Sequence, residues 1–111
     1  MTPRANTYVT DLRHFLDEET DDLATMPAPA LTLAMFLTSI VAWATNHDRH
    51  DDEITNVWCW RRPRRRRCRG EIIAHLERSS AEIVWHCPSC GVNGVIRGWE
   101  GSLWDRRPPQ A

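Results

Sequence analysis

The chain of 111 residues contains no lysine, so its fourteen strongly basic side chains are all arginines. It also has no internal repeat and no long low-complexity segment, and its length suits one domain, or a small domain with an attached helical segment. No serine–histidine–acid arrangement, phosphate-binding glycine loop or paired-carboxylate motif can be identified with any specificity. These absences favour a protein that is not an enzyme.

A secretory signal and a membrane-spanning run are also lacking. Polar residues follow Met1 without an apolar segment before a cleavage site. The longest apolar run, residues 31–44, is interrupted by hydroxyl side chains, and runs of about 10–14 residues are more often buried core helices. We therefore expect a cytoplasmic protein with no membrane contact. Thiols stay reduced in that compartment, where paired cysteines more often bind a metal than each other.

Phenylalanine and tyrosine are scarce, with two and one residues, whereas there are six tryptophans. Five of the tryptophans lie in the second half of the chain, where large rings can fill a core too small to be built from aliphatic residues. We expect Trp85 and Trp99 to be buried in this way. Trp60, which lies next to several arginines, is the better candidate for an exposed contact.

Charge is divided unevenly along the chain, although the net charge is only −1. Residues 1–55 carry ten acidic side chains and three arginines, whereas residues 56–111 carry five acidic side chains and eleven arginines. Asymmetry of this kind often marks a nucleic-acid contact. The two halves can equally neutralise each other, within one chain or across a dimer.

The first half of the chain predicts two helices. Apolar residues recur at helical spacing between Tyr8 and Leu16, and the acidic residues 17–22 end this segment. Pro29 suits the start of a second helix over residues 30–45, which is apolar on almost every side. Such a helix must be buried against more than one neighbour, which points to the first helix, the second half of the chain or a second copy of the protein.

A polar connector, residues 46–53, divides the chain into an N-terminal helical segment (residues 1–53) and a second module (residues 54–105). Residues 106–111 are expected to be a disordered tail. Histidines and aspartates in the connector could form a second metal site, but the charged residues of a linker are usually only solvated. After the connector the apolar period changes from 3.6 to 2, which predicts strands near residues 54–59, 72–77, 83–86 and 92–99, with a turn at residues 78–81.

All four cysteines lie in the second module, as Cys59, Cys68, Cys87 and Cys90. Two sulfur pairs about twenty residues apart can close around one tetrahedral ion. The spacing of Cys87 and Cys90 lets both sulfurs face one point, while the eight residues between Cys59 and Cys68 must bulge out as a wider loop. We predict one structural Zn²⁺ per chain with these four ligands, because four sulfurs leave no position for an activated water. The predicted fold class is α+β: an N-terminal helical pair followed by a small antiparallel three-stranded module of the zinc-ribbon type.

Three other uses of the cysteines stay open. They could form disulfides in any of three pairings, which the lack of a secretory signal disfavours. Cys87 and Cys90 could form a redox pair, although thioredoxin-like pairs lie where a strand enters a helix and this one continues into a strand. His75 or His86 could replace one cysteine as a ligand.

A run of arginines lies inside the first cysteine pair, with Trp58 and Trp60 beside it. It could be an exposed loop that grips phosphates while a tryptophan stacks on bases. Alternatively, the guanidinium groups offset the charge of a zinc–thiolate centre, or dock on the acidic residues 17–22 or 48–53. The candidate contacts to nucleic acid or another partner are Trp60, Arg61, Arg62, Arg64, Arg65, Arg66 and Arg67.

Several segments of the chain form a recognisable set. They are Cys-Trp-Arg-Arg-Pro-Arg-Arg-Arg-Arg-Cys-Arg-Gly from Cys59, Ile-Val-Trp-His-Cys-Pro-Ser-Cys-Gly from Ile83, Gly-Val-Ile-Arg-Gly-Trp-Glu-Gly from Gly94, and Trp104-Asp105. Together with the segment that begins at Tyr8, they resemble a group of small, uncharacterised bacterial proteins that are similar to zinc ribbons. The resemblance covers most of the chain and implies the metal site, but no activity, substrate or partner. The wide first cysteine pair departs from ordinary zinc ribbons.

Three functions follow from these observations. The leading hypothesis is a non-enzymatic module that is stabilised by zinc and contacts a protein partner or a second copy of itself. The alternative is a nucleic-acid-binding protein that uses the arginine-rich loop between Cys59 and Cys68. A thiol redox protein or a metal-dependent enzyme ranks last, and no small-molecule substrate can be identified.

Overall fold

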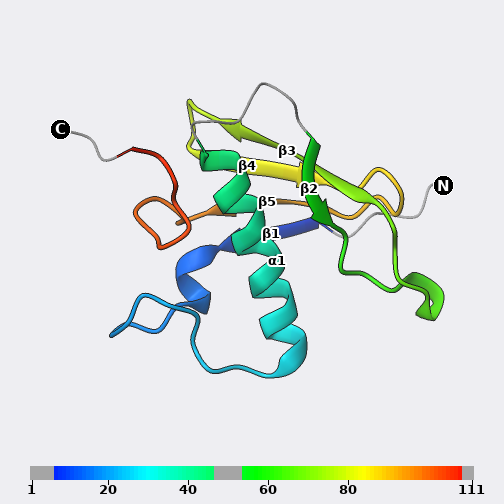
Figure 1. The fold of residues 1–111 in the computed structure, drawn as a ribbon, viewed down its shortest axis with the longest axis horizontal. Helices are drawn as coiled ribbons and strands as arrows, with labels where there is room; N and C mark the ends of the chain where they lie inside the picture. Colours follow the sequence, from blue (N-terminus) through cyan, green and yellow to red (C-terminus); the bar gives the residue numbers. More distant parts are fainter. Residues whose placement is uncertain (1–6, 47–53, 109–111) are drawn as a thin grey trace.

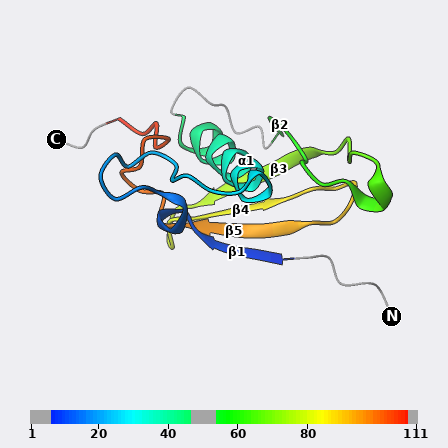
Figure 2. The ribbon, with the colours of Figure 1, turned by 90° about the horizontal axis from the view of Figure 1, so that it is seen from below.

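The computed structural model describes residues 7–46 and 54–108. Its main element is a five-stranded sheet with one helix packed on one face (Figures 1 and 2). The strand order is β1-β5-β4-β3-β2, in which only the pair β1 and β5 is parallel. The elements are β1 (Thr7–Asp11), the 3₁₀ turn η1 (Leu12–Phe15), α1 (Ala28–Thr45), β2 (Ile54–Trp58), the 3₁₀ turn η2 (Pro63–Arg65), β3 (Glu71–Glu77), β4 (Glu82–His86) and β5 (Asn93–Arg97).

The predicted first helix is wrong, because its residues form strand β1 and the turn η1. β1 pairs in parallel with β5, so that Thr7 lies opposite Asn93 although 86 residues separate them. Threonine, tyrosine and valine favour strands over helices, and in β1 they alternate between a half-buried Tyr8 and an exposed Val9. Leu12 then enters the core from η1. The apolar residues that recur at helical spacing therefore belong to a strand followed by a tight turn.

The predicted three-stranded module is also wrong, because the sheet has five strands and mixed pairing. The strands expected after the connector are present as β2 to β5, and a turn over residues 78–81 joins β3 to β4. β1 adds the fifth strand at the edge of the same sheet. The class remains α+β, with one helix instead of a helical pair.

Helix α1 begins at Ala28 and ends at Thr45, close to the predicted bounds. Pro27 is its N-cap, and Pro29 lies in its first turn, where a missing N–H costs no hydrogen bond. By length and composition the helix could cross a bilayer, with a mean hydropathy of 1.6 over 18 residues, a test that core helices of soluble proteins also pass. Here five of its buried residues belong to the core that it shares with the sheet: Phe36, Leu37, Ile40, Val41 and Ala44. The other buried residues of the helix are Ala34, Thr38 and Thr45.

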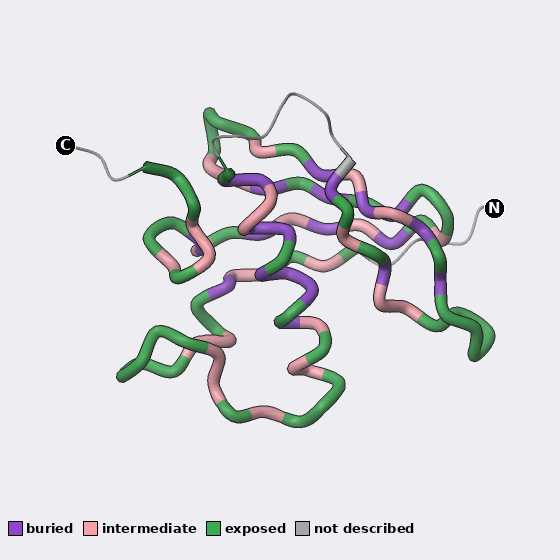
Figure 3. Tube along the Cα trace, in the orientation of Figure 1, coloured by how far each residue is buried: buried purple, intermediate pink, exposed green. Residues whose placement is uncertain are grey.

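The core lies between α1 and the sheet (Figure 3). Alternate residues of the central strands face the helix and are buried, among them Ile72, Ile83 and Ile96. The prediction that Trp85 and Trp99 fill the core is confirmed, since neither side chain is exposed. The opposite face of the sheet is open within the described residues.

Two acidic segments were considered as partners for the arginines. Residues 17–22 form an exposed turn, here called the acidic turn, in which the N–H of Asp17 donates to the carbonyl of Asp22 at 2.7 Å. The second acidic segment, residues 48–53, lies outside the described residues. The same is true of the second metal site considered for His47 and His50. The tail predicted over residues 106–111 is described only to Pro108, and within it the N–H of Arg106 donates to Thr45 Oγ1 at 2.8 Å.

Candidate metal centre

Two antiparallel hairpins bring the four cysteines to one end of the sheet. Cys59 and Cys68 lie in the loop between β2 and β3, and Cys87 and Cys90 lie in the loop between β4 and β5. Because β3 and β4 are antiparallel neighbours, both loops come out at the same end (Figure 1). The sheet topology therefore brings together two cysteine pairs that are far apart in sequence.

The sulfur positions fit a single tetrahedral ion. All four Sγ atoms lie within 4.8 Å of one another. The Sγ atoms of Cys59 and Cys90 are 3.8 Å apart, and those of Cys68 and Cys87 are 3.6 Å apart. A tetrahedron with metal–sulfur bonds of about 2.3 Å has sulfur–sulfur edges of about 3.8 Å. The four cysteines are thus positioned to coordinate one metal ion.

Backbone N–H groups donate to all four sulfurs in a repeated pattern. The donors to Cys59, Cys68 and Cys90 are the N–H groups two residues later in the chain, those of Arg61, Gly70 and Val92. Cys87 accepts from Cys90 and from Ser89, which also lies two residues on. Hydrogen bonds of this kind stabilise the thiolate form, which is the form that binds a metal.

The wide spacing of Cys59 and Cys68 is bridged by an extension of the β2–β3 hairpin. The N–H of Cys59 donates to Gly70 O at 2.9 Å, and the N–H of Cys68 donates to Arg61 O at 2.8 Å. These two bonds close the base of the loop, while η2 and the arginines extend beyond it. Eight intervening residues therefore return their two cysteines to one point.

The surroundings of Cys59, Cys87 and Cys90 shift the pKa values of these thiols in different directions. Burial raises the pKa of Cys59 and of Cys87 above the usual thiol range, despite the backbone N–H groups that donate to them. Burial also acts on Cys90, but the N–H of Val92 and the neighbouring thiols donate to this sulfur, and its pKa is lowered. Because metal-binding sulfurs must be deprotonated, and burial raises the pKa of Cys59 and Cys87, metal binding must release protons.

The geometry bears on the three other uses of the cysteines. All four are free thiols, with the closest sulfurs far beyond the disulfide bond length of about 2.0 Å. The chain after Cys90 enters β5 and not a helix, with Gly91 at φ +82° making the turn. His75 and His86 are exposed and outside the sulfur cluster. Within the described residues, the ligand set that the structure brings together consists of cysteines.

The arginine loop, residues 61–67, projects from this end of the molecule. Arg61 is half-buried, and Arg62, Arg64, Arg65, Arg66 and Arg67 are exposed. Within residues 7–46 and 54–108, no acidic side chain forms an ion pair with the loop, and no arginine side chain donates to a sulfur. The acidic turn lies at the opposite end of the long axis (Figures 1 and 2). The expectation that the loop docks on residues 17–22 of its own chain is therefore not met.

The two tryptophans beside the loop differ in exposure. Trp60, the residue expected to be exposed, is half-buried, with its ring 4.5 Å from that of Phe36 and 5.6 Å from that of Tyr8. Trp58 is instead 55% exposed. Strand β2 has an irregular register and a positive φ of 60° at Asn56, so simple alternation does not predict which tryptophan is covered. The exposed tryptophan beside the arginine loop is thus Trp58 and not Trp60, the one expected from the sequence.

Comparison with known proteins adds no relative, because no protein-family model, no curated protein and no solved structure matches the chain. The interpretation of the cluster therefore depends on its own geometry. That geometry consists of four convergent sulfurs, their N–H donors and the two hairpins that hold them.

Proposed function

We propose that Cys59, Cys68, Cys87 and Cys90 hold one structural zinc ion, and that the metal stabilises a non-enzymatic interaction module of a cytoplasmic protein. The observation that carries this proposal is the convergence of four sulfurs within 4.8 Å of one another. The N–H donors around them support it, since they would offset part of the negative charge of four thiolates.

Zinc is the favoured ion because four thiolates in a tetrahedral arrangement select soft or borderline metals. Such a set suits zinc or iron, whereas magnesium and calcium require oxygen ligands. Three of the cysteines are buried, so the ion would be largely shielded from solvent. With four protein ligands the ion has no open position for water or substrate, which is typical of a structural site.

The role as an interaction module is supported by the surface next to the sulfurs. The metal would tie together the loop whose ends are Cys59 and Cys68, and that loop presents five exposed arginines to solvent. Ordering a charged loop before it meets its partner lowers the entropy cost of binding. A partner macromolecule would then contact a preformed surface.

Metal analysis of the purified full chain tests the proposal. We expect one zinc per chain by elemental analysis and none of the visible absorption that bound iron would give. Cys87→Ser and Cys90→Ser should lose both the metal and the cooperative unfolding transition. Ser89→Ala, in the same turn but with a side chain that is exposed, should retain both.

The result that contradicts the proposal is a protein that is stably folded without metal. Equal stability of Cys90→Ser and Ser89→Ala would lead to the same conclusion. A zinc that dissociates without any change in unfolding temperature would show that the ion is bound but not structural.

A further inference from the structure

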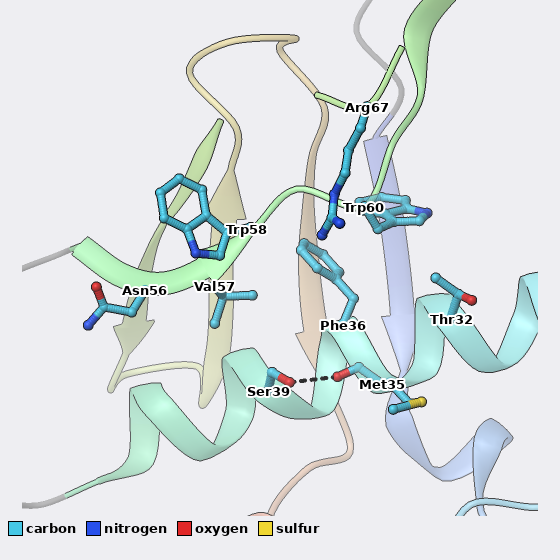
Figure 4. Close-up of a pocket in the computed structure, with 9 residues that line it drawn as sticks. All are labelled: Thr32, Met35, Phe36, Ser39, Asn56, Val57, Trp58, Trp60 and Arg67. Carbon is cyan, nitrogen blue, oxygen red and sulfur yellow. Dashed lines mark hydrogen bonds between the residues drawn. The ribbon is translucent and has the colours of Figure 1, made fainter. Parts of the chain in front are cut away.

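An open groove lies between α1 and β2, next to the arginine loop (Figure 4). Its volume of about 360 Å³ lies near the lower end of the range for ligand sites. Phe36 and Trp60 form its inner wall, Met35 and Trp58 lie at its exposed edge, and Arg67 is the charged residue among those described around it. Figure 4 shows Trp58 and Trp60 on either side of Arg67, whose guanidinium end extends toward Phe36.

The chemistry of the groove combines flat aromatic surface with unpaired positive charge. The exposed Trp58 ring is a surface for stacking, and Asn56 adds an exposed amide nearby. Glu71 lies opposite Trp58 in the sheet, but its carboxylate accepts the backbone N–H of Asn56 at 2.8 Å. The five exposed arginines of the loop have no acidic partner within the described residues.

The loop also holds backbone strain where its charge is concentrated. Arg64 and Arg65 have φ of 54° and 66°, a left-handed conformation that is unfavourable for a residue with a side chain. Glycine would adopt it at lower cost. Strain of this kind often occurs where a ligand is held. Here it accompanies arginine side chains that are exposed to solvent.

We infer that this groove and the arginine loop bind single-stranded nucleic acid, with a base stacked on Trp58 and the phosphates of adjacent nucleotides on the arginines. This inference deepens the proposed function, since it names the partner of the metal-stabilised module. Guanidinium groups pair with phosphate oxygens through parallel hydrogen bonds, and arginine also stacks on bases.

A single strand fits these observations better than the alternatives. In a duplex the bases are stacked on each other and present no free face to Trp58, whereas an unpaired base does. An acidic peptide would satisfy the arginines but leave an exposed indole and the aromatic wall without a specific partner. A single strand has flat bases that alternate with negatively charged phosphates. The bases match the aromatic groove, and the phosphates match the arginine loop.

The test is fluorescence anisotropy with a labelled oligothymidylate of about 12 nucleotides, titrated with the zinc-loaded full chain at several salt concentrations. We expect binding whose affinity falls steeply with salt. Trp58→Ala should weaken it about 5- to 150-fold, the range measured when an aromatic ring that stacks on a base is removed. Leu103→Ala, with a side chain that is also 55% exposed but lies outside the groove, should bind as the wild type does.

A second pair of variants separates binding from folding. The double change Arg64→Gly and Arg65→Gly removes two charges and also relieves the backbone strain, so it should lower affinity without lowering the unfolding temperature. It should reduce the slope of log affinity against log salt by about 0.7 for each phosphate that the variant no longer neutralises. Arg78→Gln, at the exposed turn between β3 and β4, should leave the slope unchanged.

Several results would overturn the inference. They are no binding at low salt, equal affinity of Trp58→Ala and the wild type, equal affinity for a duplex of the same length, or equal affinity for a polyglutamate peptide of similar charge. Zinc content and thermal unfolding are measured on the same samples. A folded, zinc-containing protein that does not bind would refute only this inference, whereas a folded protein without zinc would refute the proposed function.

Discussion

At the scale of single residues, Gly70 connects the two halves of the metal centre. Its N–H donates to Cys68 Sγ at 3.4 Å, and its carbonyl accepts the N–H of Cys59 at 2.9 Å. A Cβ atom at this position would overlap Cys87 Sγ and lie 2.9 Å from the Cβ of Ser89. Glycine is required here because the two loops approach each other closely, and not because of an unusual φ.

Gly70→Ala should therefore damage the centre. We expect a loss of about 1–3 kcal/mol in the free energy of unfolding, because the methyl group overpacks the cluster. Zinc affinity should fall about 10- to 100-fold, as for other changes next to metal ligands. Urea unfolding and competition with a chromophoric chelator measure the two effects.

The matched control is Gly101→Ala. A Cβ at residue 101 meets nothing within 4 Å, but the φ of +75° strains any residue with a side chain. This variant should lose about 1 kcal/mol of stability and keep its zinc affinity. Equal zinc affinities of the two variants would contradict the close approach described for Gly70.

At the scale of elements, Asp11 stabilises the junction between β1 and η1. Its carboxylate accepts from the backbone N–H of Arg13 at 3.0 Å and from the guanidinium group of the same residue. The side-chain hydrogen bond from Arg13 is the main cause that lowers the pKa of Asp11 to about 2, from its usual value of 3.8. The interaction therefore requires the ionised carboxylate.

Asp11→Ala should destabilise the protein by about 0.5–2 kcal/mol at neutral pH, the usual cost of losing a helix cap. Since the folded pKa is lowered, the contribution of this carboxylate is complete above about pH 3.8 and is lost as the pH falls through about 2. The difference between variant and wild type should therefore stay constant from about pH 7 to pH 5. Over the same range the zinc-dependent stability should fall, because acid protonates the thiolates.

Urea unfolding at a series of pH values measures both trends. Glu100→Ala, which removes an exposed acid 4.0 Å from Arg107, serves as the control and should change stability by less than about 0.5 kcal/mol. A cost of Asp11→Ala that already disappears between pH 7 and pH 5 would contradict the lowered pKa.

At the scale of the whole molecule, the arginine loop and the four convergent sulfurs are concentrated at one end. The arginine loop and the β2–β3 and β4–β5 loops, which carry the four cysteines, lie at the end opposite the acidic turn (Figures 1 and 2). The net charge of −1 therefore conceals a separation of basic and acidic groups between the two ends of the part that the structure describes. This arrangement would orient an approaching polyanion toward the groove and away from the acidic turn.

If the ion is structural, stability must depend on zinc concentration. A ligand that binds only the folded state adds about 1.4 kcal/mol to the free energy of unfolding for each tenfold rise in free ligand above its dissociation constant. Thermal unfolding in zinc buffers should show this dependence, and magnesium should have no effect because it prefers oxygen ligands. An unfolding temperature that does not change with free zinc would contradict a structural role.

The local pattern of apolar and turn residues in the sequence alone determined much of the secondary structure of this protein. The helix over α1, the strands β2 to β5 and the turn between β3 and β4 follow from apolar period and turn residues. The four cysteines could be assigned to one cluster because the sequence places them as two pairs about twenty residues apart, a spacing that favours metal binding. The helix, strand and turn predictions depend on residues that are close together in the sequence, whereas the prediction of the cysteine cluster depends on the spacing of the two pairs.

Tertiary structure decided the rest. Residues 7–11 became a strand because β5, more than eighty residues away, supplies a parallel hydrogen-bonding partner, whereas the sequence showed only a short apolar spacing that suits either element. Trp58 is exposed and Trp60 half-buried because α1 brings Phe36 against one indole and not the other. Where the local spacing of apolar residues fits two conformations equally well, strand pairing and packing with distant parts of the chain select one of them.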